Sequence, residues 1–282
     1  MKRFFALSVL LLWLLSGCAI PTIPTTQPTT GAPAVPSTAP TTEPTTPTIP
    51  ETVPPTEPTT APTTVPATTA PAEPTHSELY IPGVSVEDVI QYFNEVCLAA
   101  EFVNGGDPRF LQRWEDPILY ACVGSPTEKD MEVLRGFVDW LNTVEGFPGM
   151  YETEDYAAAN LQIHFYGFED YIDLMGENFY GTDGGVTFWY NGADEIFRGI
   201  IGYRTDVDQE TRNSVILEEI YNGLGPVNDT DLRTDSVIYS GFSTPQQLSE
   251  IDELLLKLLY HPEMWCGMNA ARCEAMIRQL YY

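Results

Sequence analysis

Apolar side chains recur every three or four residues in several stretches after residue 78, which is the spacing of a buried helix face. The first stretch follows Ser85, in a sequence that resembles a capping box, and predicts a helix to about Phe102. Residues 125–128 form a second strong helix start, with proline in the first turn. Further helical segments are expected around 108–114, from about 208, over 248–260 after a start at Thr244, and from about 269.

Strands are predicted where the apolar pattern has a period of two. Residues 161–166 alternate Leu, Ile and Phe with Gln, His and Tyr, as in a half-buried strand. Residues 118–123 form a short apolar run, and 186–190 with 196–203 suggest a hairpin through Asn191-Gly192. Because helices and strands interleave, the predicted fold class is α/β or α+β, with one mixed sheet flanked by helices.

The first eighteen residues have the form of a bacterial lipoprotein signal peptide. Lys2 and Arg3 give a positive start, and an apolar run too short to span a bilayer follows. Leu15-Ser16-Gly17-Cys18 then resembles a lipobox, whose cysteine becomes the lipidated N-terminus after cleavage. Two lipid chains anchor a protein far better than one. We therefore expect lipidation at Cys18, a boundary after residue 18, and a location on the extracytoplasmic face of a bacterial membrane.

Residues 19–77 are predicted to be a disordered linker. From residue 21 to 77 there are 16 Pro and 20 Thr but no Trp, Tyr, Phe or Cys, so little apolar surface offsets the entropy of folding. Proline favours polyproline II at about 3.1 Å per residue, which makes a stalk of ~100–180 Å. Such a stalk is long enough to carry the domain predicted for residues 78–282 to the cell wall.

The predicted domain is strongly acidic, with 36 Asp and Glu against 11 Lys and Arg. Nucleic acids and anionic lipids bind basic surfaces, so neither is an expected partner of the domain. The expected partners are the membrane, through the lipid anchor at Cys18, and a cell-wall or extracellular protein or glycan. The acidity itself specifies no ligand.

Four cysteines remain in the predicted domain, and an even number in an exported domain permits disulfides. Cys266 and Cys273 flank a turn that contains Gly267, which favours this pair and leaves Cys97 with Cys122. Four buried thiols are the alternative. None of the cysteines forms a C-x-x-C hook, so they do not indicate a zinc site.

The chain contains the frame of a zinc-peptidase helix, H-E-x-x-H-x-x-G-x-x-H, with another residue at each histidine position. In that motif the histidines bind the metal and the glutamate is the general base. Glu219 and Gly225 are kept, whereas Glu218, Asn222 and Asn228 occupy the ligand positions. Amide oxygens are weak zinc ligands, and calcium takes six to eight oxygens, so no metal or other cofactor is expected. The simplest structural interpretation is a solvated helix face for Glu218, a buried carboxylate for Glu219 and a helix C-cap for Gly225.

Together with other short segments, this frame resembles the bacterial family described as domain of unknown function 2927, whose C-terminal half is similar to metzincin-type peptidases. The resemblance spans most of residues 78–282 and depends on the order and spacing of the segments. In the first half these are Tyr92-Phe93-Asn94-Glu95, Glu101, Arg113-Trp114, Pro117-Ile118 and Ala159-Asn160-Leu161. In the second half they are Glu218-Glu219 to Gly225, residues 235–239, 248–252 and 259–262, and Gly267-Met268.

The resemblance implies a zincin-like domain with a degenerate metal site. In metzincins the segment after the metal helix carries a methionine turn beneath the site, and Val237-Ile238 take that place here. The kept glutamate and glycine then belong to a peptidase scaffold that has lost its zinc ligands.

Other patterns have simpler structural explanations. The oxygen-rich loops at 206–208 and 228–231 are better explained as helix caps and turns than as calcium sites. The three histidines, His76, His164 and His261, do not cluster in sequence and are interpreted as structural. Phe188-Trp189-Tyr190 and Trp265 suggest an aromatic platform, although an aromatic strand packed on a core is commoner.

Three functions stay open at this point. The first is a surface lipoprotein whose degenerate domain is non-catalytic and acts in binding or envelope structure. The second is an active metal-dependent peptidase with atypical ligands that uses Glu219 as general base. The third is a carbohydrate-binding module built on the aromatic residues around Trp189.

Overall fold

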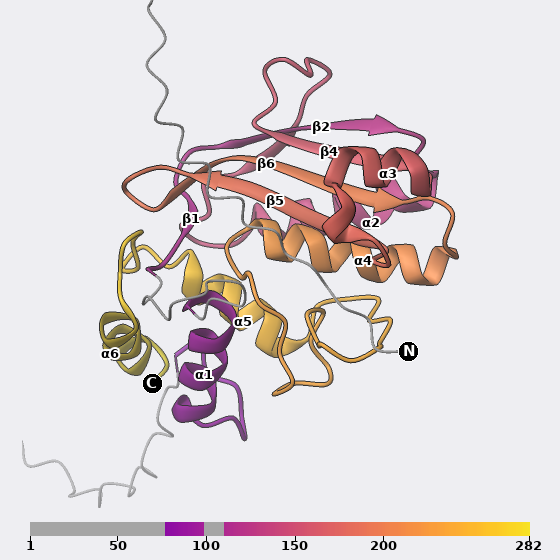
Figure 1. Ribbon diagram of the computed structural model, residues 1–282. Helices are drawn as coiled ribbons and strands as arrows, with labels where there is room; N and C mark the ends of the chain where they lie inside the picture. Colours follow the sequence, from indigo (N-terminus) through magenta and orange to yellow (C-terminus); the bar gives the residue numbers. More distant parts are fainter. Residues whose placement is uncertain (1–76, 99–109) are drawn as a thin grey trace, which may run out of the picture. The chain divides into compact units, whose positions relative to one another are not determined.

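A mostly parallel sheet organises the domain in the computed structural model, which describes residues 77–98 and 110–282 (Figure 1). Within these residues the sheet has six strands, with the order β1-β6-β4-β2-β3 and β5 on the free side of β6. All neighbours are parallel except the β5–β6 hairpin. The strands are β1 Arg113–Trp114, β2 Ile118–Gly124, β3 Met150–Glu152, β4 Leu161–Tyr166, β5 Gly184–Tyr190 and β6 Glu195–Arg204.

Helices cover both faces of the sheet. Helices α2 (Glu128–Leu141) and α4 (Gln209–Gly223) lie on one face, and α3 (Phe168–Met175) lies on the other (Figure 1). Two neighbouring strand residues make the division clear. On β6, the Ile201 side chain lies next to Gly223 and therefore points toward α4. The next residue, Gly202, lies against the Met175 side chain and therefore faces α3. The mixed sheet flanked by helices that the sequence predicts is confirmed.

A second helical layer lies on the side of α4 away from the sheet (Figure 1). It consists of α1 (Val86–Phe93), the π-helical turn Asn94–Leu98, α5 (Glu250–Leu259) and α6 (Ala270–Leu280). The Tyr221 hydroxyl of α4 donates to the Asp252 carbonyl of α5 at 3.2 Å. Because α4 is enclosed between two layers, almost every residue from Ser214 to Gly223 is buried, including the polar ones.

Most predicted elements are confirmed, and two are corrected. Arg113-Trp114, expected in a helical turn, pair with Glu195-Ile196 as strand β1. The helix expected from Thr244 begins only at Glu250, because Ser249 is the N-cap and forms a capping box with Asp252. The first helix ends as an α-helix at Phe93 and continues as the π turn, and its expected end at Phe102 lies outside the described residues.

Several elements and segments were not anticipated or fall outside the described part. Strand β3, helix α3 and a 3-10 turn at Glu177–Phe179 were not predicted. The signal peptide with Cys18, the linker up to residue 76, and His76 lie outside the described residues. Among the helices that the structure describes, none is both long and apolar enough to cross a bilayer.

Candidate functional site

The last two turns of α4 bring Glu218, Glu219 and Asn222 together. Residues three and four apart lie on neighbouring positions of a helix surface, so the three side chains share one sector of α4. All three are buried, as is Asn228 in the loop that follows. The solvated face expected for Glu218 is therefore wrong, since only 7% of its surface is exposed.

Glu219 is a buried carboxyl next to the first residue of β5. Only 3% of its surface is exposed. A Cβ on Gly184 would lie 2.9 Å from the Glu219 Cγ, so the glycine makes the space that this side chain occupies. Burial, with a smaller contribution from the nearby Asp229 carboxylate, raises the pKa of Glu219 well above its ordinary value. The burial expected for Glu219 is confirmed.

The two asparagines at ligand positions differ in their contacts. The Asn228 side-chain amide donates to the Glu95 carbonyl at 2.9 Å, and its backbone N–H donates to the Val96 carbonyl at 3.3 Å. Asn228 thus holds the loop against the π turn. The Asn222 Oδ1 is buried and has no hydrogen-bond partner.

Gly225 ends this segment in a conformation that suits glycine. Its φ is +133°, and a Cβ at this position would lie 2.5 Å from the Gln112 carbonyl oxygen. Leu224 is the C-cap residue of α4, and Gly225 follows it directly. The expected role at the helix C-terminus is confirmed to within one residue.

The turn at residues 236–238 is held by a carboxylate on α5. The Val237 N–H donates to the Asp252 Oδ2 at 3.1 Å, and the Ile238 N–H donates to the Ser236 Oγ at 3.1 Å. Both apolar side chains of the turn are buried. Packing and backbone hydrogen bonds therefore fix this turn without any ligand.

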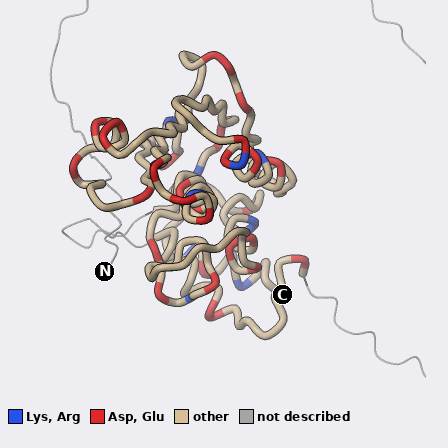
Figure 2. The backbone as a smooth tube through the Cα atoms, turned by 90° about the vertical axis from the view of Figure 1, so that its right-hand side faces the viewer, with Lys and Arg blue, Asp and Glu red and all other residues tan. Residues whose placement is uncertain are grey.

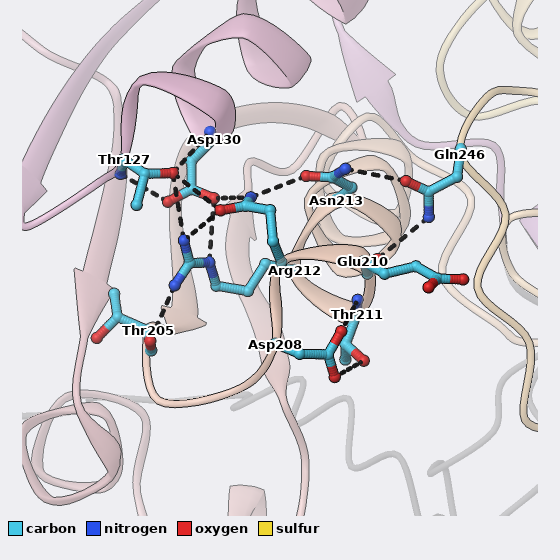
Figure 3. Close-up of polar contacts among 10 residues, drawn as sticks. Thr127, Asp130, Thr205, Asp208, Glu210, Thr211, Arg212, Asn213 and Gln246 are labelled. Carbon is cyan, nitrogen blue, oxygen red and sulfur yellow. Dashed lines mark hydrogen bonds and ion pairs between the residues drawn. The ribbon is translucent and has the colours of Figure 1, made fainter.

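The other end of α4 carries a polar cluster that the sequence did not reveal (Figure 3). Arg212 donates to the Asp130 carboxylate at 3.1 Å and to the Thr205 carbonyl at 2.9 Å. Asp130 is fully buried and also belongs to the capping box of α2 with Thr127. The Thr127–Asp130 spacing signals the cap, but only the fold brings Arg212 to it. This cluster joins α2 to α4 and is structural.

The oxygen-rich loops also serve as caps and ion pairs. Asp208 is the N-cap of α4, with its carboxylate accepting from the Thr211 N–H at 3.0 Å. Asp206 accepts from Arg204 at 2.7 Å. Among the residues that the structure describes, no group of three or more His, Cys, Asp and Glu has an arrangement that would hold a metal ion. Acidic residues are spread over most of the surface segments, with few basic ones between them (Figure 2).

The predicted disulfides do not form, because no disulfide joins any two of Cys97, Cys122, Cys266 and Cys273. Cys273 faces the core from α6, whereas the Cys266 thiol donates to the Arg113 carbonyl at 3.6 Å. Burial raises the pKa of Cys266, Cys273 and Cys122 to about 12 in each case. These thiols are therefore poor nucleophiles at neutral pH.

The aromatic residues do not form one platform. Phe188 and Trp189 are adjacent on β5 and point to opposite faces of the sheet. Phe188 is buried, and the Arg198 guanidinium lies 5.4 Å from the centre of the Trp189 ring. The strand is explained by packing, and one side of its only tryptophan is covered by arginine.

The family model described as "Protein of unknown function (DUF2927)" matches residues 86–279. The chain belongs to the DUF2927 family. The match covers the elements from α1 to α6, so both the sheet and the second helical layer belong to the DUF2927 domain. The matched region, residues 86–279, lies within the domain that the sequence predicts for residues 78–282.

Two further comparisons add little to the family assignment. The crystal structure of myroilysin matches with 10% identity and a TM-score of 0.28, covering 72% of this chain and 98% of that chain. At this level of similarity no residue role is carried over. Comparison with curated proteins finds no match.

Proposed function

We propose that this DUF2927 protein is a lipid-anchored surface protein whose domain acts by binding and not by hydrolysis. The observation that carries the proposal is the burial of Glu219. A general base must reach the proton that it abstracts, whereas only 3% of the Glu219 surface is exposed and its side chain packs against Gly184 at the start of β5. Burial also raises the pKa of Glu219 well above its ordinary value, which disfavours the ionised form that a base needs.

The donor set at the former ligand positions supports the same conclusion. Zinc is bound by imidazole, thiolate or carboxylate, but two of the three positions are amides. The Asn228 amide is already hydrogen-bonded to the Glu95 carbonyl. These residues do not fit a catalytic zinc ion, so no hydrolytic step is derived through one.

Elemental analysis of the purified protein tests the proposal. The wild-type chain is expected to carry no stoichiometric zinc after incubation with zinc and desalting. The matched variant changes Glu218, Asn222 and Asn228 to histidine. If the variant binds zinc and the wild type does not, the residues at these three positions are the reason that the wild type lacks the metal. One zinc per wild-type chain, or chelator-sensitive peptide cleavage that Glu219→Gln abolishes, would instead establish the peptidase.

The lipid anchor is a separate part of the proposal and has its own test. It is supported by the lipobox that ends at Cys18. Metabolic labelling with a fatty acid and membrane fractionation are compared for wild type and Cys18→Ala in the bacterial host. Wild type is expected in the labelled membrane fraction, and the variant is expected to lose the label. Equal labelling of both would exclude Cys18 as the anchor site.

A further inference from the structure

His164 lies in the middle of β4 on the sheet face opposite α2 and α4. Its neighbours in register are Val123 on β2 and Gly202 on β6. The side chain is only 4% exposed, and neither ring nitrogen has a hydrogen-bond partner. A neutral imidazole always carries one N–H, so both a donor and an acceptor are left unsatisfied in an apolar place.

Two tyrosines cover the imidazole. Tyr166, on the same face of β4, has its ring centre 5.2 Å away, and Tyr156 packs edge-on at 6.3 Å. Tyr156 belongs to the connection between β3 and β4, which stands out above the sheet in Figure 1. Its hydroxyl donates to the Gln162 Oε1 at 2.8 Å, and 47% of its surface is exposed. Tyr156 is thus a cap between His164 and water, with one side-chain hydrogen bond to β4.

Within residues 77–98 and 110–282, no element packed around His164 offers a charge that would stabilise its protonated form. The α3 residues that pack on neighbouring Gly202 are Tyr171 and Met175. Arg204, two residues farther along β6, is paired with Asp183 and Asp206. Glu154 and Asp155, the two residues directly before Tyr156, are exposed. Burial alone lowers the pKa of His164 from its ordinary value of 6.5.

Thr153 and Asn160 fix the two ends of this connection, because the Thr153 N–H donates to the Tyr120 carbonyl at 2.8 Å and the Asn160 N–H donates to the Leu119 carbonyl at 3.0 Å. We propose that residues 154–159, between these two anchors, form an acid-sensitive cap, which moves off the sheet when His164 is protonated. In the closed state two N–H groups and a full charge would be enclosed without a partner. In the open state the imidazolium gains water and comes within reach of Glu154 and Asp155. Opening also uncovers His164 and Gln162, the two β4 side chains that Tyr156 contacts. Acidification therefore exposes part of a sheet face that is covered at neutral pH.

Hydrogen exchange of the full chain between pH 7.5 and 5 tests the cap. After correction for intrinsic rates, the opening of residues 154–159 is expected to increase about tenfold per pH unit below about 6.5, until His164 titrates in the closed state. His164→Phe keeps an aromatic ring and removes the titration, so its opening is expected to be independent of pH. Tyr156→Phe removes the hydrogen bond to Gln162, so it is expected to open more at every pH while keeping the pH dependence.

The control is His261→Gln, because His261 is hydrogen-bonded to the Glu263 N–H and lies outside the cap. It is expected to behave as wild type. An unchanged pH dependence in His164→Phe would overturn the proposal, as would a simultaneous loss of protection in α2 and α4. Ring NMR of His164 in the wild type gives a second measurement. Its titration is expected to coincide with signal changes in residues 154–159, and a titration that leaves them unchanged would refute the cap.

Discussion

The Ser236 hydroxyl donates to the Asp252 carboxylate at 2.6 Å, in the buried centre of the second helical layer. The Asp252 Oδ1, which accepts this bond, also accepts from the Tyr92 hydroxyl at 3.0 Å. The Asp252 Oδ2 accepts from the N–H groups of Val237 and Ser249 at 3.1 and 2.9 Å. One fully buried carboxylate therefore joins α1, the turn after α4 and the start of α5. Burial and the nearby carboxylate together raise the pKa of Tyr92 far above its usual range, so it remains a hydrogen-bond donor.

Asp252→Asn is expected to destabilise the domain by about 2–4 kcal/mol, since an amide NH₂ cannot accept from the donors on that side of the carboxylate. Urea unfolding followed by circular dichroism measures the change. The matched control is Asp139→Asn, at an exposed position of α2, which is expected to change stability by less than about 0.5 kcal/mol. Similar losses for the two variants would show that the Asp252 network does not stabilise the fold.

Glu219→Gln is expected to stabilise the protein more as the pH rises. The folded-state pKa of Glu219 is raised above its ordinary value of 4.5, so the folded state keeps a proton that the unfolded state has released. The wild type then loses stability from about pH 4.5 upward, by as much as about 1.4 kcal/mol per pH unit, until the folded carboxyl ionises. Glutamine is similar in shape to the protonated acid and does not titrate.

Urea unfolding at pH 5 and pH 8 checks this expectation, because the difference between variant and wild type must grow with pH. Glu169→Gln, on the exposed side of α3, removes a carboxylate without burial and serves as the control. A constant difference between Glu219→Gln and wild type across this range would mean that Glu219 is ionised in the folded state. That result would also reopen its use as a general base.

The four longer strands and most helix starts could be predicted because their signals are local. Periodicity identifies β4, and the spacing of Ser85 and Asp88 identifies the start of α1. The burial of Glu218 on α4 could not be predicted in this way, since a polar helix position suggests a solvated face and its burial depends on tertiary contacts. The same holds for Asp252, whose sequence context signals a cap, while its bonds to Tyr92 and Ser236 depend on tertiary contacts.

Gly184→Ala is expected to destabilise the domain by about 1–3 kcal/mol, because overpacking forces side chains or backbone to shift. The new Cβ would lie 2.3 Å from the Val215 Cγ1 and 2.9 Å from the Glu219 Cγ. Gly192→Ala is the matched control, because its Cβ would meet nothing within 4 Å. Thermal unfolding compares the two. An unchanged midpoint for Gly184→Ala would mean that Glu219 does not pack against β5.

The four domain cysteines are expected to react as thiols once the protein is unfolded. Cys97 and Cys273 are buried and the other two are half-buried, so modification in the native state should be slow, and burial raises the pKa of Cys122, Cys266 and Cys273 to about 12. Alkylation of non-reduced protein in denaturant, followed by peptide mass spectrometry, should label all four residues. A reducing agent should leave the unfolding midpoint unchanged, because no covalent loop constrains the unfolded chain. A Cys266–Cys273 cross-linked peptide in the non-reduced sample would contradict the absence of a disulfide between these residues. It would also require the turn at Gly267 to bring α6 closer to Cys266.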